Sequence, residues 1–115
     1  MSIEIYHNPR CRKSRKALEL LEKNAKDFII IEYLKDVPSK DQLRDVIKKL
    51  NIKASDLIRT TEAIYKENYK GKELSEDEWL DAMITHPKLI QRPIVLKDDK
   101  AVVGRPPELV LDILN

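Results

Sequence analysis

Residues 3–23, IEIYHNPRCRKSRKALELLEK, contain the change from strand to helix that decides the fold prediction. Ile3–Tyr6 alternates apolar and polar side chains, as a strand does, and Asn8-Pro9 indicates the turn that follows. Between Ser14 and Lys23 the apolar residues recur at helical spacing. The segment therefore predicts strand, loop and helix, with the chain's one cysteine, Cys11, in the loop.

The elements on the C-terminal side of this segment predict a βαβ unit followed by helices. Phe28–Tyr33 is a nearly continuous, β-branched apolar run, and its distance from the first strand suits a crossover with a buried parallel pair. Capping-box signals begin at Ser39 and at Ser75, each ahead of an apolar stripe. We expect residues from about Ser39 to His86 to be mainly helical.

The end of the chain predicts a hairpin and a last helix. Ile94–Lys97 and Ala101–Val103 flank the short polar turn Asp98-Asp99-Lys100, and an amphipathic helix follows the prolines after Gly104. The order βαβ, helices, ββα is the layout of an α/β domain with a thioredoxin-like fold and a four-stranded mixed sheet. We predict one domain over residues 1–115, with a helical insert at about 38–87 between its halves.

Composition excludes several classes of protein. The 115 residues carry a net charge of +2, so no global field proposes a nucleic-acid partner. The longest apolar run, FIII, is far shorter than the roughly 20 residues of a membrane helix. A single cysteine makes no internal disulfide, and no secretion signal opens the sequence. We expect a cytoplasmic protein without membrane contact; one cysteine and two histidines also make a metal site implausible.

Cys11 is the candidate nucleophile. A thiolate attacks more readily than a thiol, and a helix N-terminus favours the thiolate. The adjacent cations are expected to do the same, and the Ser14 hydroxyl stands where it can donate to the sulfur. The alternative is a cysteine that only fills a buried apolar position. The cations next to Cys11 are Arg10, Arg12, Lys13 and Arg15.

Three later arginines are candidates for holding an oxyanion. A helix N-terminus attracts oxyanions, and a guanidinium bonds their oxygens in pairs. Arg59 lies in DLIRTTE, Arg92 in LIQRPIV and Arg105 in VVGRPPE, and the last two directly precede a proline at a strand boundary. An arginine in a surface position without a special role is the alternative for each.

Four segments together resemble the glutaredoxin-coupled arsenate reductases of the thioredoxin-like superfamily. They stand in the same order and span nearly the whole chain, so their joint match is specific where a single tetrapeptide is not. The segments are HNPRCRKS at His7–Ser14, DLIRTTE at Asp56–Glu62, HPKLIQRPIV at His86–Val95 and GRPPE at Gly104–Glu108.

The resemblance implies a role for each matching residue. Cys11 corresponds to the nucleophile that attacks arsenate, and His7 and Ser14 correspond to residues that tune the thiol. Pro93 corresponds to the cis-proline beside the reactive thiol, so we predict a cis Arg92–Pro93 bond. The arginines that would hold the oxyanion are Arg59, Arg92 and Arg105.

The implied activity is arsenate reduction in arsenic resistance, without a bound cofactor. Arsenate forms an ester with Cys11, glutathione attacks the ester as co-substrate, and a glutaredoxin reduces the resulting mixed disulfide. A chain with one cysteine needs such an external thiol, because it has no second sulfur to resolve the disulfide.

One departure keeps two other functions open. Arg12 and Lys13 stand where the resembled enzymes have Gly-Thr, so arsenate is not fixed as the substrate. One alternative is a thiol-transfer enzyme acting on glutathione mixed disulfides, which does not need Arg59. The other is a relative of the Spx regulators, which bind RNA polymerase and use a C-x-x-C switch, but Ser14 occupies the place of the second cysteine.

Overall fold

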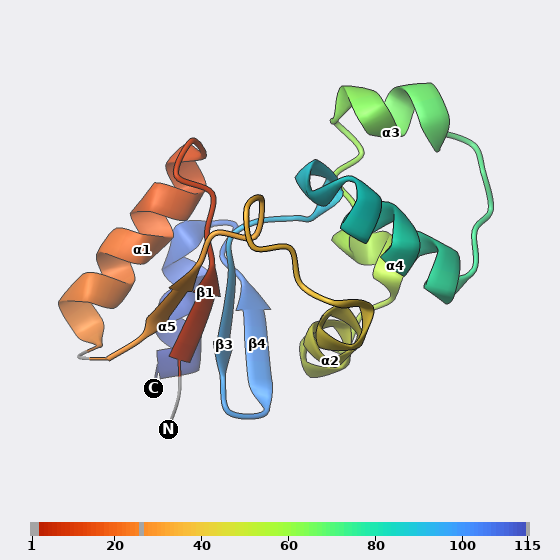
Figure 1. Ribbon diagram of the computed structural model, residues 1–115. Helices are drawn as coiled ribbons and strands as arrows, with labels where there is room; N and C mark the ends of the chain where they lie inside the picture. Colours follow the sequence, from red (N-terminus) through yellow and green to blue (C-terminus); the bar gives the residue numbers. More distant parts are fainter. Residues whose placement is uncertain (1–2, 26, 115) are drawn as a thin grey trace. The chain divides into compact units, whose positions relative to one another are not determined.

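The structure is a computed structural model that describes residues 3–25 and 27–114 (Figure 1). Contacts divide the chain into two compact units. The first unit joins Met1–Asp36 to Arg92–Asn115, and the second is Val37–Gln91. Each helix in the described part of the chain is too short or too polar to span a bilayer.

The first unit is built around a four-stranded mixed sheet, as the sequence predicts, and the strand order in this sheet is β2-β1-β3-β4. The central strand β1 pairs in parallel with β2 and antiparallel with β3, which in turn pairs antiparallel with β4. The elements of this unit are β1 (Ile3–Tyr6), α1 (Arg12–Asn24), β2 (Ile29–Ile31), β3 (Ile94–Lys97), β4 (Lys100–Val103), the 3₁₀ turn η3 (Pro107–Leu109) and α5 (Val110–Leu114).

Helices α1 and α5 lie next to each other and bury their apolar faces together with β1 and β3 (Figure 1). The helical stripe predicted for the first helix supplies Ala17 and Leu21, both fully buried. They meet Ile5 of β1 and Val95 of β3 in one hydrophobic cluster. This cluster joins the two ends of the chain, so it holds the loop after β1 and the segments around β3 and β4 in one body.

The starts of α1 and β4 differ from the sequence prediction. The first helix begins at Arg12 and not at Ser14, because Cys11 already caps it. Lys100 belongs to β4 and pairs with Lys97, so the hairpin turn has two residues, and Asp98 takes the left-handed conformation there with φ 55°.

The sequence predicts that both strands of the parallel pair are buried, and this is wrong for the second strand, β2. The predicted strand Phe28–Tyr33 shortens to β2, which lies at the edge of the sheet. Ile29 and Ile30 are 56% and 47% exposed. An apolar run is compatible with an edge strand because only one side of such a strand is paired.

The second unit is helical. Its elements are α2 (Lys40–Leu50), α3 (Ala63–Asn68), α4 (Glu76–Thr85) and the 3₁₀ turns η1 (Ala54–Leu57) and η2 (Pro87–Leu89). Both predicted capping boxes are present: Ser39 with Gln42 starts α2, and Ser75 with Glu78 starts α4. The organisation of residues 1–115 as one domain with an insert at about 38–87 stays a prediction.

Gly104 lies where the backbone after β4 approaches the proline before β3. Its N–H donates to the Pro93 carbonyl at 2.8 Å. A Cβ at this position would stand 3.0 Å from Pro93 Cγ and 3.1 Å from Val110 Cγ2. Both neighbours are fully buried, so they have little room to withdraw.

Gly104→Ala is expected to lower the free energy of unfolding by about 1–3 kcal/mol, because the added methyl group overpacks this site. Urea unfolding of the two proteins measures the difference. Val110→Ala removes one of the two close contacts. The double variant should therefore lose less stability than the sum of the single variants, and strictly additive losses would show that the overlap is not the cause.

Candidate active site

The loop between β1 and α1 is shaped by backbone hydrogen bonds. The N–H of His7 donates to the Ile31 carbonyl at 2.9 Å, which continues the β1–β2 ladder by one residue. The Asn8 carbonyl accepts the N–H of Cys11 at 3.0 Å, and the Cys11 carbonyl accepts the N–H of Arg15 at 2.9 Å. Cys11 thereby becomes the N-cap residue of α1, with φ −94° and ψ 122°.

A cluster of buried polar side chains forms hydrogen bonds that hold this loop in place. The Ser14 hydroxyl oxygen accepts the backbone N–H of Asn8 at 2.9 Å and shares a hydrogen bond with His7 Nδ1 at 2.7 Å. Ser14 is fully buried, and His7 and Asn8 are each 6% exposed. Asn8 Oδ1 also accepts the N–H of Arg10 at 3.0 Å. The sequence indicates Asn8 only as a turn residue, whereas the structure gives it three of the loop's bonds.

The pKa of Cys11 is set by a balance of burial against positive groups. Cys11 is half-buried, and burial alone raises the thiol pKa because the thiolate loses water. The backbone N–H of Ser14, the guanidinium of Arg92 and the backbone N–H of Lys13 together outweigh that effect. The pKa of Cys11 is therefore lowered, and the thiolate fraction near neutral pH rises.

Two details of the expected thiol environment are wrong. The Ser14 group that acts on the sulfur is its backbone N–H, because its hydroxyl is engaged with His7 and Asn8. The side-chain charge that contributes most is that of Arg92, not a cation next to Cys11 in the sequence. The neighbouring cations are exposed: Arg10, Arg12, Lys13 and Arg15.

His7 lies at the carboxyl end of β1, and Glu32 follows β2 at the same edge of the sheet. Both line a depression of about 300 Å³ on this side of the loop. Burial lowers the pKa of His7, and this outweighs the charge of Glu32 and the hydrogen bond to Ser14, which act in the opposite direction. The imidazole is therefore neutral at pH 7, which suits its position in the buried cluster.

Arg92 and Arg105 belong to the C-terminal part of the first unit. Arg92 precedes β3 and acts on the Cys11 sulfur both as a hydrogen-bond donor and as a charge. Arg105 Nη1 donates to the Arg92 carbonyl at 3.4 Å, so the two arginine segments lie together. The Arg92–Pro93 bond is cis, as predicted, and the Arg105–Pro106 bond is also cis, which the sequence does not predict.

Arg59 belongs to the second unit. Its N–H donates to the Leu89 carbonyl at 2.7 Å, and its side chain, 16% exposed, has Nε 3.8 Å from Glu62 Oε2. Its predicted part in an oxyanion site stays a prediction. Among the described residues, no group of three His, Cys, Asp or Glu side chains is placed to hold a metal ion.

The structure thus unites five of the sequence-predicted site residues in one body: His7, Cys11, Ser14, Arg92 and Arg105. Pro93 is fully buried and lies in the same body. This arrangement has the parts that an attack on an oxyanion needs: a thiolate, backbone N–H groups at a helix N-terminus, and guanidinium groups.

Comparisons with known proteins find relatives over nearly the whole chain. The model of the ArsC family matches residues 6–113. A protein of Haemophilus influenzae named arsenate reductase is 46% identical to the chain over 116 residues, which is 99% of this chain and all of that one. The Escherichia coli protein YfgD, whose function is uncharacterised, is 45% identical over 98% of this chain and 97% of its own.

A solved structure has the same fold. The arsenate reductase of Vibrio cholerae superposes with a TM-score of 0.93 at 44% identity and covers 98% of each chain. The α/β fold predicted from the sequence is therefore the thioredoxin-like fold of this group.

Arg92→Ala is expected to raise the pKa of Cys11, because it removes a guanidinium that acts on the sulfur both as a hydrogen-bond donor and as a charge. The pH dependence of alkylation by iodoacetamide measures this pKa. Arg12→Ala is the matched control, since Arg12 is next to Cys11 in the sequence but exposed. An equal rise in both variants would contradict the dominance of Arg92.

Ser14→Ala should lower the free energy of unfolding by about 2 kcal/mol or more, because it leaves two buried groups, the Asn8 N–H and His7 Nδ1, without their partner. Urea unfolding measures the loss. Ser55→Ala is a control for the same chemical change at an exposed serine. Equal effects of the two substitutions would mean that the buried cluster contributes nothing to stability.

Proposed function

The chain belongs to the ArsC family, and we propose that it is a thiol-dependent arsenate reductase with Cys11 as its nucleophile. The observation that carries this proposal is the interaction of the Arg92 guanidinium with a sulfur whose pKa is lowered. A guanidinium in that position stabilises the thiolate before substrate binds. It could also donate hydrogen bonds to an oxyanion that the thiolate attacks.

In the first step the Cys11 thiolate attacks the arsenic atom of arsenate. A sulfur–arsenic bond forms, one arsenate oxygen leaves as water after protonation, and arsenic stays in the +5 state. Negative charge gathers on the remaining oxygens. The N–H groups at the start of α1 and the guanidiniums of Arg92 and Arg105 are the donors proposed to stabilise that charge, with Arg59 as a third guanidinium.

In the second step glutathione supplies the electrons. Its sulfur attacks the Cys11 sulfur, a disulfide forms, and the electron pair of the broken sulfur–arsenic bond reduces arsenic to the +3 state. Arsenite leaves, and Cys11 carries glutathione as a mixed disulfide. A glutaredoxin then takes over the glutathionyl group and restores the Cys11 thiol, a transfer that this chain cannot perform with its one cysteine.

The proposal requires that Cys11 be kept reduced between turnovers, which suits a cytoplasmic location. It involves no bound cofactor or metal, because thiols carry both electrons. Thiol transfer on glutathione mixed disulfides is the second candidate, because it uses Cys11 and its positive surroundings but neither arsenate nor Arg59.

Arsenite formation from arsenate, with glutathione and glutaredoxin present, is the direct test. Wild type is expected to turn over, and Cys11→Ser to be inactive. Arg59→Ala should lower kcat/KM for arsenate by about 10²-fold, the typical effect of removing one donor to a developing oxyanion. Arg44→Ala is the matched control, because Arg44 is an exposed arginine paired with Asp41 and Asp77 on the helical unit.

Each failure has its own meaning. No arsenite from wild type, together with rapid exchange on glutathione mixed disulfides, would replace arsenate reduction by thiol transfer. Full activity of Arg59→Ala would remove Arg59 from the oxyanion site while leaving Cys11 as the nucleophile.

A further inference from the structure

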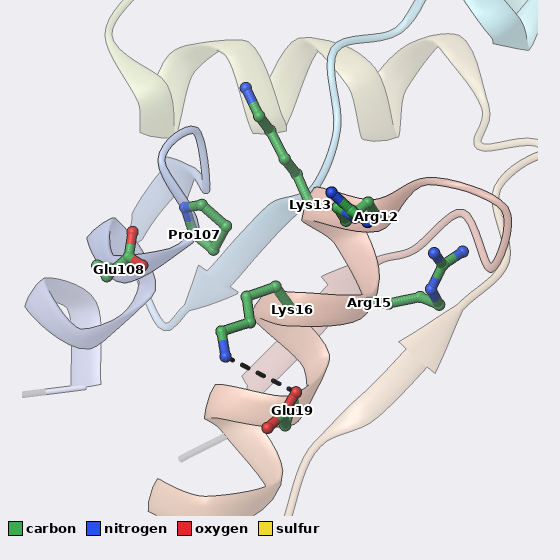
Figure 2. Close-up of a pocket in the computed structure, with 7 residues that line it drawn as sticks. All are labelled: Arg12, Lys13, Arg15, Lys16, Glu19, Pro107 and Glu108. Carbon is green, nitrogen blue, oxygen red and sulfur yellow. Dashed lines mark ion pairs between the residues drawn. The ribbon is translucent and has the colours of Figure 1, made fainter.

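A groove runs along one flank of α1 and is closed on its other side by the turn at Pro107 and Glu108 (Figure 2). Its volume is about 500 Å³, within the range of sites that hold small molecules. Arg12 and Lys13, the first two residues of α1 after its cap Cys11, belong to the lining of this groove. The backbone N–H of Lys13 acts on the Cys11 sulfur itself.

The groove carries charges of both signs, and one of its cations, Arg15, donates from Nη1 to the Pro9 carbonyl at 2.9 Å. Arg12 and Lys13 lie at the Cys11 end, and their side chains form no ion pair within residues 3–25 and 27–114. Farther along α1, Lys16 Nζ stands 3.9 Å from Glu19 Oε2, with both side chains about half exposed, so this pair is weak. Glu108 of η3 also lines the groove (Figure 2) and has no ion pair among the described residues.

This pattern does not suit an inorganic oxyanion alone. The lining has four cations and two carboxylates, so it attracts anions as a whole. Glu19 is paired with Lys16 and Lys23, which leaves Glu108 as the carboxylate that would gain from a positive group on the ligand. The charges suit a small peptide that has both carboxylates and an ammonium group. Its carboxylates would interact with Arg12 and the two lysines, and its ammonium group with Glu108. A thiol on the same peptide would stand beside Cys11.

We propose that the groove between α1 and η3 is the subsite that binds glutathione for attack on Cys11. Arg12, Lys13 and Lys16 attract its two carboxylates, and Glu108 attracts its ammonium group. The inference deepens the proposed function and rests on glutathione being the second reactant there. It also gives a reason for Arg12 and Lys13 in this loop. They attract glutathione, while Arg92 interacts with the Cys11 sulfur and with the oxyanion.

The test uses thiol–disulfide exchange, in which arsenate takes no part. The Cys11 thiolate attacks the glutathione sulfur of glutathionyl 2-thiopyridyl disulfide, a new disulfide forms, and 2-thiopyridine leaves with the electron pair of the old one. Hydroxyethyl 2-thiopyridyl disulfide has the same leaving group without the peptide. The ratio of the two rate constants in one protein cancels any change in the reactivity of Cys11.

Wild type should prefer the glutathionyl reagent about tenfold or more at low salt, and the preference should fall as salt is added. In the double variant Lys13→Gln/Lys16→Gln this preference should be about fivefold smaller, which corresponds to the free energy of one or two exposed ion pairs. Lys48→Gln/Lys53→Gln, which changes two exposed lysines outside the groove, should keep it. A wild-type ratio near one, or equal losses in the two double variants, would overturn the proposal.

The ammonium contact has its own comparison. Acetylation of the glutathione amino group should reduce the preference in wild type but not in Glu108→Gln, because the partner charge is already gone. The same reduction in both proteins would remove Glu108 from the subsite. A failed subsite with intact arsenite formation would leave the proposed function standing, and an intact subsite without arsenite formation would support thiol transfer.

Discussion

The backbone N–H groups at the start of α1 and the guanidinium of Arg92 act together on the Cys11 sulfur. The lowered pKa of this thiol depends on the fold of the first unit, which places both next to the sulfur. The cluster of Ala17, Leu21 and Val95 fixes α1 against the sheet. The buried Ser14 hydroxyl fixes the loop that starts the helix. The backbone N–H groups at the start of α1 and the Arg92 guanidinium are what oppose the effect of burial on the pKa of Cys11.

Local features of the sequence predict most of the elements. The strands Ile3–Tyr6 and Ile94–Lys97 have the expected bounds, and both capping boxes have the expected partners. Each of these features depends on residues only a few positions apart. The exposure of Ile29 is different. It depends on where β2 stands in the sheet, and an apolar run reads the same in an edge strand as in a buried one.

The structure brings together several of the candidate site residues that the sequence proposes, but two of the interactions at the thiol differ from those expected. The sequence identifies Cys11, Arg92 and Ser14, but assigns the electrostatic effect to neighbouring cations and the Ser14 effect to its hydroxyl. Proximity in sequence is a poor guide at a helix start, because side chains of the first turn point outward while its backbone N–H groups point at the cap. The outward cations instead line a groove beside the nucleophile.

The central claim is that one thiol on this chain couples arsenate to glutathione. Intact-protein mass spectrometry after mixing with arsenate and glutathione, with no glutaredoxin present, tests it most directly. The account predicts that a single glutathione accumulates on Cys11, in step with the arsenite released and only when arsenate is present. Glutathionylation at the same rate without arsenate, or arsenite release that leaves Cys11 unmodified, would contradict it.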